Sequence, residues 1–367
     1  MPEPLSIVAN LLVAVALVGR GTSWAGEEAV VFVSSAPQKK LSVHDLDLGT
    51  GVLEPRGDVP LGGAPGPQFL HPDGKRLYVS LRSTESVAAF RVDRKTGALR
   101  PIRTSGIDLN ATYIAADRSG RWLLAVSYRD GKVATYRIAD DGGVVGDPVS
   151  VFDTHRCAHA ILADKANRFV LVPHTCANAV YQFRFDAKTG SLTPNDPARV
   201  EPAVGLEPRH LAFHPDLDVI YFDDEVGSSV TAYRYDRERG SVVPFQTVST
   251  LPAGFSDKNT CADLELTTDG RFVYASNRGH NSIAGFSADP KDGRLTAIGQ
   301  FGTGDTPRSF NLSPNDRWIV VAGQRSNDLT VHRRDTANGT LQKVAVHPTG
   351  AGPAWVEIVG LKKRAAR

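Results

Sequence analysis

The sequence has little of what several protein classes require. Its 367 residues include one methionine and three cysteines, with 8% aromatic, 41% hydrophobic and 22% charged residues. These fractions exclude a disordered, coiled-coil or collagen-like chain. The net charge is only +2 and no run of five basic residues occurs, which argues against nucleic acid as the main partner. The 34 glycines and 23 prolines favour many turns over long helices.

The apolar stretch near the N-terminus is too short to cross a bilayer. Leu5 to Val18 covers 14 residues, whereas a spanning helix needs roughly 20. Ser23 and Ala25 then provide small residues at the −3 and −1 positions of a secretory cleavage site, although no Lys or Arg precedes the apolar stretch. We therefore expect a signal peptide at 1–25, a periplasmic or secreted domain at 26–367, and no stable membrane insertion after cleavage. If this segment is instead a disordered tail or results from a misassigned start codon, it is not a functional signal and the protein would be cytoplasmic.

One pattern occurs six times between residues 68 and 341. In each copy a short apolar strand ends in a polar turn, and a second strand, a polar loop, an alternating third strand and a less regular outer strand follow. The turn positions recur every 46 to 53 residues, at Asp73, Ser119, Lys165, Asp216, Asp269 and Asn315. That period is typical of the four-stranded blades of a β-propeller.

The two ends of the chain complete a seventh copy. Residues 30–53 provide second, third and fourth strands, and residues 353–358 resemble an unpaired first strand. A blade built from both ends would close the ring and leave no open sheet edge. The sequence therefore predicts an all-β, seven-bladed propeller in one domain.

Several segments resemble the propeller lactonase family, which includes bacterial 6-phosphogluconolactonases and fungal carboxy-cis,cis-muconate cyclases. They read GLEPRHLAFHP, YFDDEVGSSV, DLELTTDGRFVYASNR, TPRSFNLSPNDRWIVVAGQRS and GPAWVEI. The similarity runs from about Val30 to Ile358. It implies a lactone substrate. It also implies that His159, Arg209, Glu225 and Arg278 match the His, two Arg and Glu that are implicated in the active site of the cyclases.

Alignment of the copies places further polar residues at equivalent positions. The start of the inner strand is occupied in successive blades by His159, Arg209, Ala262, Arg308 and Ala354. The loop after the second strand holds Arg82, Thr175, Glu225, Arg278 and Gln324. Because the first two strands of a blade are antiparallel, both sets should meet at one mouth of the channel. Each arginine could instead pair with a carboxylate of its own blade, but repetition at one mouth favours a binding site for a compact anion.

These residue types suit lactone hydrolysis, which needs a base, an acid for the leaving alkoxide and stabilisation of an oxyanion. We expect His159 or Glu225 to be the base, and Arg209 and Arg278 to contact the oxyanion and the acid or phosphate group. Arg82, Arg308 and Gln324 are expected as additional substrate contacts. The sequence has no G-x-S-x-G nucleophile motif and no phosphate-binding G-x-x-x-x-G-K loop.

A cluster of histidines and cysteines leaves three interpretations open. His155, Cys157 and His159 alternate, and His174 and Cys176 do so one hairpin later. They could bind zinc or copper, form a Cys157–Cys176 disulfide, or be ordinary core residues, and Cys261 is left over in each case. We expect no metal and no cofactor.

Three functions are compatible with this reading. The first is hydrolysis of a sugar-acid lactone by a monomer, most closely of the 6-phosphogluconolactonase type, with a small anionic sugar lactone as its partner and no nucleic acid. The second is a muconate-type cyclase, which closes a lactone. The third is a periplasmic binding or scaffold module without activity, since propellers host many functions.

Overall fold

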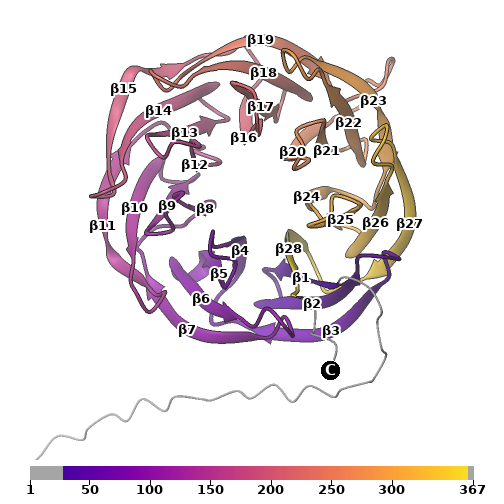
Figure 1. Ribbon diagram of the computed structural model, residues 1–367, viewed down its shortest axis with the longest axis horizontal. Helices are drawn as coiled ribbons and strands as arrows, with labels where there is room; N and C mark the ends of the chain where they lie inside the picture. The colour runs from indigo at the N-terminus through magenta and orange to yellow at the C-terminus, as the bar shows by residue number, and fades with distance from the viewer. Residues whose placement is uncertain (1–27, 363–367) are drawn as a thin grey trace, which may run out of the picture.

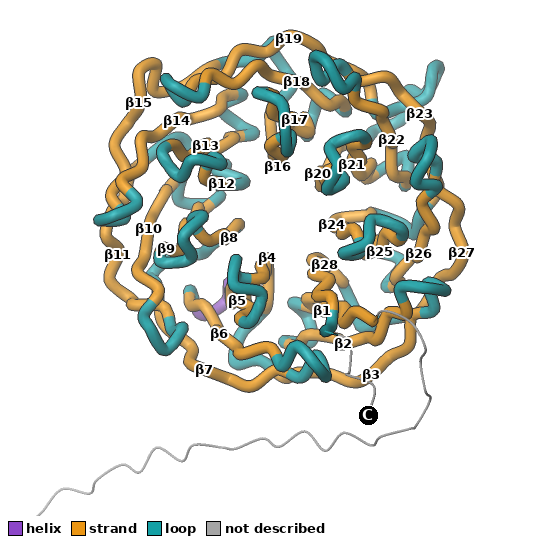
Figure 2. Tube along the Cα trace, in the orientation of Figure 1, coloured by secondary structure: helices purple, strands orange, loops and turns teal. Residues whose placement is uncertain are grey.

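Seven four-stranded antiparallel sheets surround a central channel in the computed structural model (Figure 1). The structure describes residues 28–362, so the expected signal peptide at 1–25 lies outside the described residues. Within residues 28–362 every element is a strand except the 3₁₀ turn Arg82–Thr84 (Figure 2). The described residues contain no helix long and apolar enough to cross a membrane.

The blades follow one another along the chain, each running from the channel outward. Blade 1 has β4 (Pro65–Leu70), β5 (Arg76–Leu81), β6 (Ser86–Val92) and β7 (Leu99–Gly106). Blade 2 has β8 (Tyr113–Ala116), β9 (Trp122–Ser127), β10 (Lys132–Ile138) and β11 (Val144–Asp153). Blade 3 has β12 (Leu162–Ala163), β13 (Phe169–His174), β14 (Ala179–Asp186) and β15 (Ser191–Val200). Blade 4 has β16 (Pro208–Phe213), β17 (Val219–Asp224), β18 (Ser229–Asp236) and β19 (Ser241–Ser249).

The remaining blades repeat this arrangement. Blade 5 has β20 (Thr260–Leu266), β21 (Phe272–Arg278), β22 (Ser282–Ala288) and β23 (Leu295–Gly302). Blade 6 has β24 (Pro307–Leu312), β25 (Trp318–Gly323), β26 (Asp328–Arg334) and β27 (Leu341–Pro348). Blade 7 joins the two ends of the chain as β28 (Pro353–Gly360), β1 (Glu28–Ser35), β2 (Lys40–Asp47) and β3 (Leu53–Pro60).

The predicted closure of the ring is confirmed. Strand β28 pairs antiparallel with β1, with Val30 opposite Val359 and Phe32 opposite Glu357. Hydrogen bonds between the two ends of the chain thus complete blade 7, and the ring has no gap at which a strand edge would be exposed.

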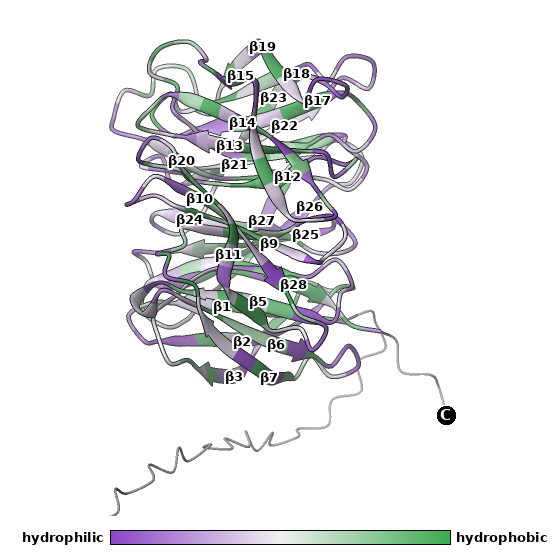
Figure 3. Cartoon of the chain, turned by 90° about the vertical axis from the view of Figure 1, so that its left-hand side faces the viewer, coloured by the Kyte–Doolittle hydropathy of each residue, from purple (hydrophilic) through white to green (hydrophobic). Residues whose placement is uncertain are grey.

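Apolar side chains fill the spaces between neighbouring blades. Every residue of β9, β13, β17 and β25 is buried, whereas outer strands such as β7 and β11 are mostly exposed. The second strand of each blade lies between two other strands and between two neighbouring sheets, so both of its faces are covered. In the side view, hydrophilic residues gather on the loops of the two faces (Figure 3).

Tight turns connect the third and fourth strands, for example at residues 186–190 in blade 3. At Gly190 the backbone has φ 78°, and its N–H donates to the Asp186 carbonyl over 2.7 Å. A Cβ atom here would lie 2.4 Å from the ring of Trp122 in blade 2. Glycine is therefore required both for the left-handed backbone and for the contact between two blades.

The expected first strand of blade 3 is largely missing. Strand β12 contains only Leu162 and Ala163, and residues 154–161 before it form a single β-bridge, between Ala158 and His174. His159 thus lies in an irregular segment and does not begin a strand as predicted. A disulfide between Cys157 and Cys176, with 5.5 Å between the Cα atoms, holds this segment to the end of β13.

Candidate active site at one mouth of the channel

A cavity of about 540 Å³ opens at the end of the channel where the inner strands begin. Five of the seven predicted site residues line it: Arg82, His159, Arg209, Arg308 and Gln324. They come from blades 1, 3, 4 and 6, so residues far apart in the sequence share one cavity. We call this space the mouth cavity.

Glu225 and Arg278, the other two predicted residues, lie behind Arg209. Pro208 at the start of β16 pairs with Asp224 at the end of β17, which brings Arg209 and Glu225 together as the hairpin predicts. Arg278 Nη2 donates to Glu225 Oε1 over 2.5 Å, and Arg209 Nε lies 3.5 Å from Oε2. Glu225 thus joins two guanidinium groups, one from blade 4 and one from blade 5.

The two arginines decide the protonation of Glu225. Burial alone would raise its pKa, but the charges of Arg209 and Arg278 outweigh burial and hold the pKa below the usual value. The carboxylate is therefore ionised at neutral pH, and it is a weak proton acceptor because both of its oxygens face positive charge.

His159 has the opposite electrostatic surroundings. Burial, together with the charges of Arg209 and other nearby basic groups, lowers its pKa well below 6.5, so the imidazole is neutral at pH 7. Its Nδ1 is buried without a hydrogen bond, which leaves Nε2 as the nitrogen that can reach the cavity. The backbone N–H of His159 donates to the Pro173 carbonyl over 3.0 Å. A neutral imidazole that faces the cavity can accept a proton from a bound water molecule.

The arginines of the mouth cavity differ in their hydrogen-bond and ion-pair partners. Arg82 donates from Nε and Nη2 to Asn110 Oδ1 over 3.1 and 2.8 Å. Arg308 lines the cavity without a hydrogen bond or ion pair to any residue in the described part of the chain. Burial and the charges of Arg209 and Arg278 lower the pKa of Arg308, because both disfavour its positive charge. An anionic ligand would relieve this repulsion.

Bulges in the inner strands explain why so many side chains meet at this mouth. In β16 the pairing shifts between Pro208 and Leu211, so that two residues, Arg209 and His210, face one residue on β17. Similar register shifts occur near the start of β4, β20, β24 and β28. A bulge redirects neighbouring side chains that would otherwise point to opposite faces of the sheet. Consecutive residues can therefore both lie along the channel.

Further channel residues occupy the next position of the repeat and were not predicted. One position after the predicted set lie Ala160, His210, Asp263, Ser309 and Trp355. Trp355 lines the mouth cavity, and the His210 ring lies 5.2 Å from the His159 ring. Asn110, the partner of Arg82, lies in a loop outside the repeated positions and gives no comparable signal.

The histidine and cysteine cluster resolves to one of its three interpretations. Cys157 and Cys176 are paired, Cys261 is buried as a free thiol, and His174 Nε2 lies 2.9 Å from Thr154 Oγ1. Residues 28–362 hold no group of three His, Cys, Asp or Glu side chains that could bind a metal ion.

Comparison with known proteins gives the family. The family described as "Lactonase, 7-bladed beta-propeller" matches residues 29–358. The chain belongs to this lactonase family. It is 32% identical over 335 residues to a 6-phosphogluconolactonase of Pectobacterium carotovorum, covering 91% of this chain and 99% of that protein. A 6-phosphogluconolactonase of Serratia proteamaculans is 31% identical over 330 residues, covering 90% and 98%.

Solved structures show the same fold at lower identity. The periplasmic gluconolactonase PpgL of Pseudomonas aeruginosa matches with a TM-score of 0.85 and 24% identity, over 91% of this chain and all of that one. A putative 6-phosphogluconolactonase of Bacteroides fragilis matches with a TM-score of 0.82 and 24% identity, over 93% and 100%. The fold shared with these structures thus agrees with the family that the sequence match gives.

Proposed function

We propose that this lactonase hydrolyses a sugar-acid lactone in the mouth cavity, with His159 as the base. The observation that carries the proposal is that a neutral histidine and an unpaired arginine, Arg308, line the same cavity as Arg209. Such a cavity offers a proton acceptor and cationic donors to one small anionic ligand. Glu225 is assigned the role of orienting Arg209 and Arg278, because its two oxygens are engaged with them.

The proposed reaction has two steps. His159 Nε2 takes a proton from water while the water oxygen bonds to the lactone carbonyl carbon, and the resulting oxyanion is stabilised by Arg209 and Arg308. The bond between this carbon and the ring oxygen then breaks, and the ring oxygen takes the proton from His159. The products are a hydroxyl group and a carboxylic acid, which ionises. No cofactor takes part in these steps.

For the substrate, we put a 6-phosphogluconolactone-like molecule first, because the relatives at 31–32% identity carry that name. Arg82 and Gln324 would contact its distal part, where a phosphate adds negative charge. An exported enzyme would instead meet an unphosphorylated lactone. The test measures hydrolysis of both lactones by the purified protein. Faster hydrolysis of either one identifies the substrate class, and hydrolysis of neither overturns the proposal in favour of a binding module.

We also propose export with cleavage after Ala25. The disulfide between Cys157 and Cys176 supports it, since disulfides persist in oxidising compartments. N-terminal sequencing of protein from the producing cell tests the proposal. A chain that retains its N-terminal residues and is found in the cytosol would contradict it and favour the phosphorylated substrate.

A further inference from the structure

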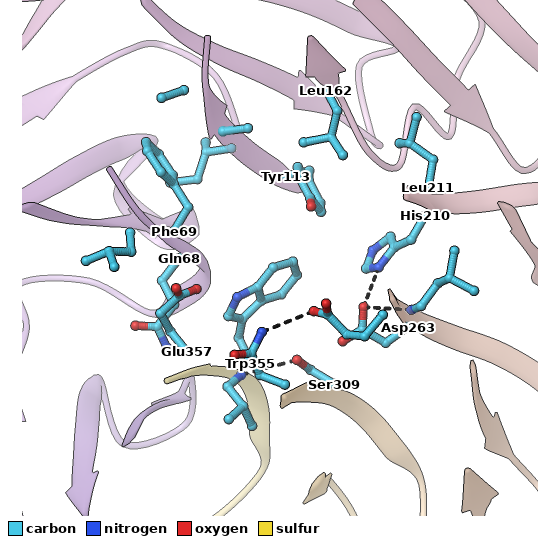
Figure 4. A pocket seen from close by; sticks show the side chains of 18 of the residues that line it. Gln68, Phe69, Tyr113, Leu162, His210, Leu211, Asp263, Ser309, Trp355 and Glu357 are labelled. Carbon is cyan, nitrogen blue, oxygen red and sulfur yellow. Dashed lines mark hydrogen bonds and ion pairs between the residues drawn. The ribbon is translucent and has the colours of Figure 1, made fainter. Parts of the chain in front are cut away.

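A second chamber of about 400 Å³ (Figure 4) shares Trp355 with the mouth cavity. We call it the inner chamber; its walls include Tyr113, His210, Asp263, Glu265, Trp355 and Glu357. Tyr113, His210 and Trp355 contact one another with ring centroids 5.3 to 5.9 Å apart. Trp355 lines both spaces, whereas His210, directly after Arg209 in the chain, lines the inner chamber.

His210 connects Arg209 to a buried carboxylate. His210 Nδ1 lies 2.7 Å from Asp263 Oδ1, drawn as a dashed line in Figure 4, and Arg209 Nη1 lies 3.1 Å from His210 Nε2. All three residues are at most 5% exposed. Guanidinium groups only donate hydrogen bonds, so Nε2 must be the accepting nitrogen and Nδ1 must carry the proton that Asp263 accepts. The chain of donors therefore runs from Arg209 through His210 to Asp263.

The far end of this chain is fixed by the backbone. Asp263 Oδ2 accepts the Phe310 N–H of blade 6 over 3.0 Å, and Oδ1 also accepts the Leu264 N–H over 3.1 Å. The N–H of His210 itself donates to Asp223 Oδ1 over 2.6 Å. Hydrogen bonds from blades 4, 5 and 6 thus hold the His210 ring in one orientation and one tautomer.

We propose that Asp263 and His210 are positioning residues that orient the Arg209 guanidinium toward the substrate. The idea rests on the proposed function, since it assigns Arg209 a role in that site. Arg209 donates a hydrogen bond from Nη1 to His210, and its Nε lies at ion-pair distance, 3.5 Å, from Glu225 Oε2, so Nη2 is the nitrogen assigned to the substrate. A carboxylate behind the imidazole fixes its tautomer and strengthens the bond that it accepts from arginine. Asp263 itself lines the inner chamber and does not line the mouth cavity.

The test is a double-mutant cycle between Asp263→Asn and Arg209→Lys, measured on kcat/KM for the lactone. Loss of a carboxylate behind a metal-bound histidine costs about 10- to 100-fold, and we expect a value at the lower end here, so Asp263→Asn alone should lower kcat/KM by about tenfold. In the Arg209→Lys background the same change should cost less than about twofold, because lysine has no Nη1 for His210 to hold. Equal losses in both backgrounds would overturn the proposal.

Variants at His210 separate positioning from packing. His210→Gln can place an amide oxygen near the position of Nε2 and should retain more of kcat/KM than His210→Leu, which has no acceptor. Equal losses in both variants, with equal falls in Tm, would indicate packing alone and overturn the proposal. Glu265→Gln is the matched control: Glu265 lies two residues after Asp263, bonds Asn311 and has no contact with Arg209. It should leave kcat/KM unchanged.

Affinity for 6-phosphogluconate, measured by calorimetry, distinguishes this proposal from the proposed function. If the wild type binds this anion but hydrolyses no lactone, the proposed reaction fails. The positioning proposal is then tested by the same cycle on Kd, and additive losses in affinity would overturn it. If the wild type neither binds nor hydrolyses, both proposals fail together.

Discussion

The mouth cavity and the inner chamber lie in one channel and differ in the ionisable groups that line them. The mouth holds guanidinium groups, which stay charged at any physiological pH. The inner chamber holds carboxyl groups, and burial raises the pKa of Glu357 to about 8 and that of Glu265 well above its usual value. These acids can take up a proton and become neutral, whereas Arg308 can be neutralised only by a bound anion. A pocket lined by basic groups that cannot lose their charge at neutral pH is therefore a candidate site for an anion.

His159→Gln should produce the largest loss and tests whether the mouth is the reacting end. Removal of a general base costs about 10² to 10⁴ in rate, so we expect kcat to fall by about 10³ while the fold persists. In the wild type, only the neutral imidazole is active, so kcat/KM should decline with falling pH only well below pH 6.5, where His159 is protonated. Stopped assays across pH check this. A decline centred above pH 6.5 would contradict the assignment.

Arg209→Lys should produce the next largest loss. Lysine keeps the charge but cannot bond Glu225, His210 and the substrate from one planar group. A lost preorganised oxyanion contact costs about 3 kcal/mol, or about a hundredfold in kcat. Thermal denaturation of the same protein is the control, since a role in folding alone predicts a lower Tm with native turnover per folded molecule. Native kcat would mean that the mouth cavity is not the active site.

Glu225→Gln should have a smaller effect, about tenfold on kcat/KM, because glutamine can still accept hydrogen bonds but no longer attracts the two arginines. The pH dependence below pH 6.5 should persist in this variant, since it is assigned to His159. If that dependence disappears in Glu225→Gln and remains in His159→Gln, the base is Glu225 and the two roles are exchanged.

Replacement of both cysteines, Cys157→Ser with Cys176→Ser, probes how the irregular segment of blade 3 presents His159. The disulfide closes a loop with a sequence separation of 19 residues, and its loss should cost about 3 kcal/mol of stability. Turnover should fall by about threefold, less than for any mouth variant, because other backbone hydrogen bonds still hold His159. The wild type treated with a reducing agent should match the variant, and the variant itself should not respond. Unchanged turnover in both would show that the disulfide serves stability only.

Glu357→Gln tests the inner chamber, with an expected effect on stability and none on activity. A folded-state pKa raised from 4.5 to about 8 means that the folded protein binds this proton more tightly than the unfolded chain. The stability of the wild type should therefore fall as pH rises from about 4.5 to about 8. The fall should be smaller in Glu357→Gln, by about 3 °C in Tm at about pH 8. The exposed Glu54→Gln is the control. Loss of lactonase activity in Glu357→Gln would remove the distinction between the two spaces.

Much of the fold could be predicted because each blade repeats a local pattern. Turn residues such as Asp73 and Asp269 mark the period, and the apolar segments between them have the length and alternation of strands. The unpaired segment at 353–358 predicted the shared blade, since a propeller must close its ring. The prediction was wrong at His159, because β12 is too short to include it. A local pattern cannot show that residues 154–161 form one β-bridge, a few loop hydrogen bonds and a disulfide in place of a regular strand.

The sequence by itself determined the seven blades and the end of the channel at which the seven predicted residues gather, because both depend on the order and spacing of residues along each strand. Only the tertiary structure decided which of them line the cavity and what holds them. The bulge in β16 directs Arg209 and His210 along the channel, and from blade 5 Asp263 contacts His210 while Arg278 contacts Glu225. Side-chain direction at a bulge and contacts between blades depend on register and on partners about 50 residues away. The spacing of residues within one repeat therefore predicts neither the side-chain directions at the bulge nor the contacts between blades.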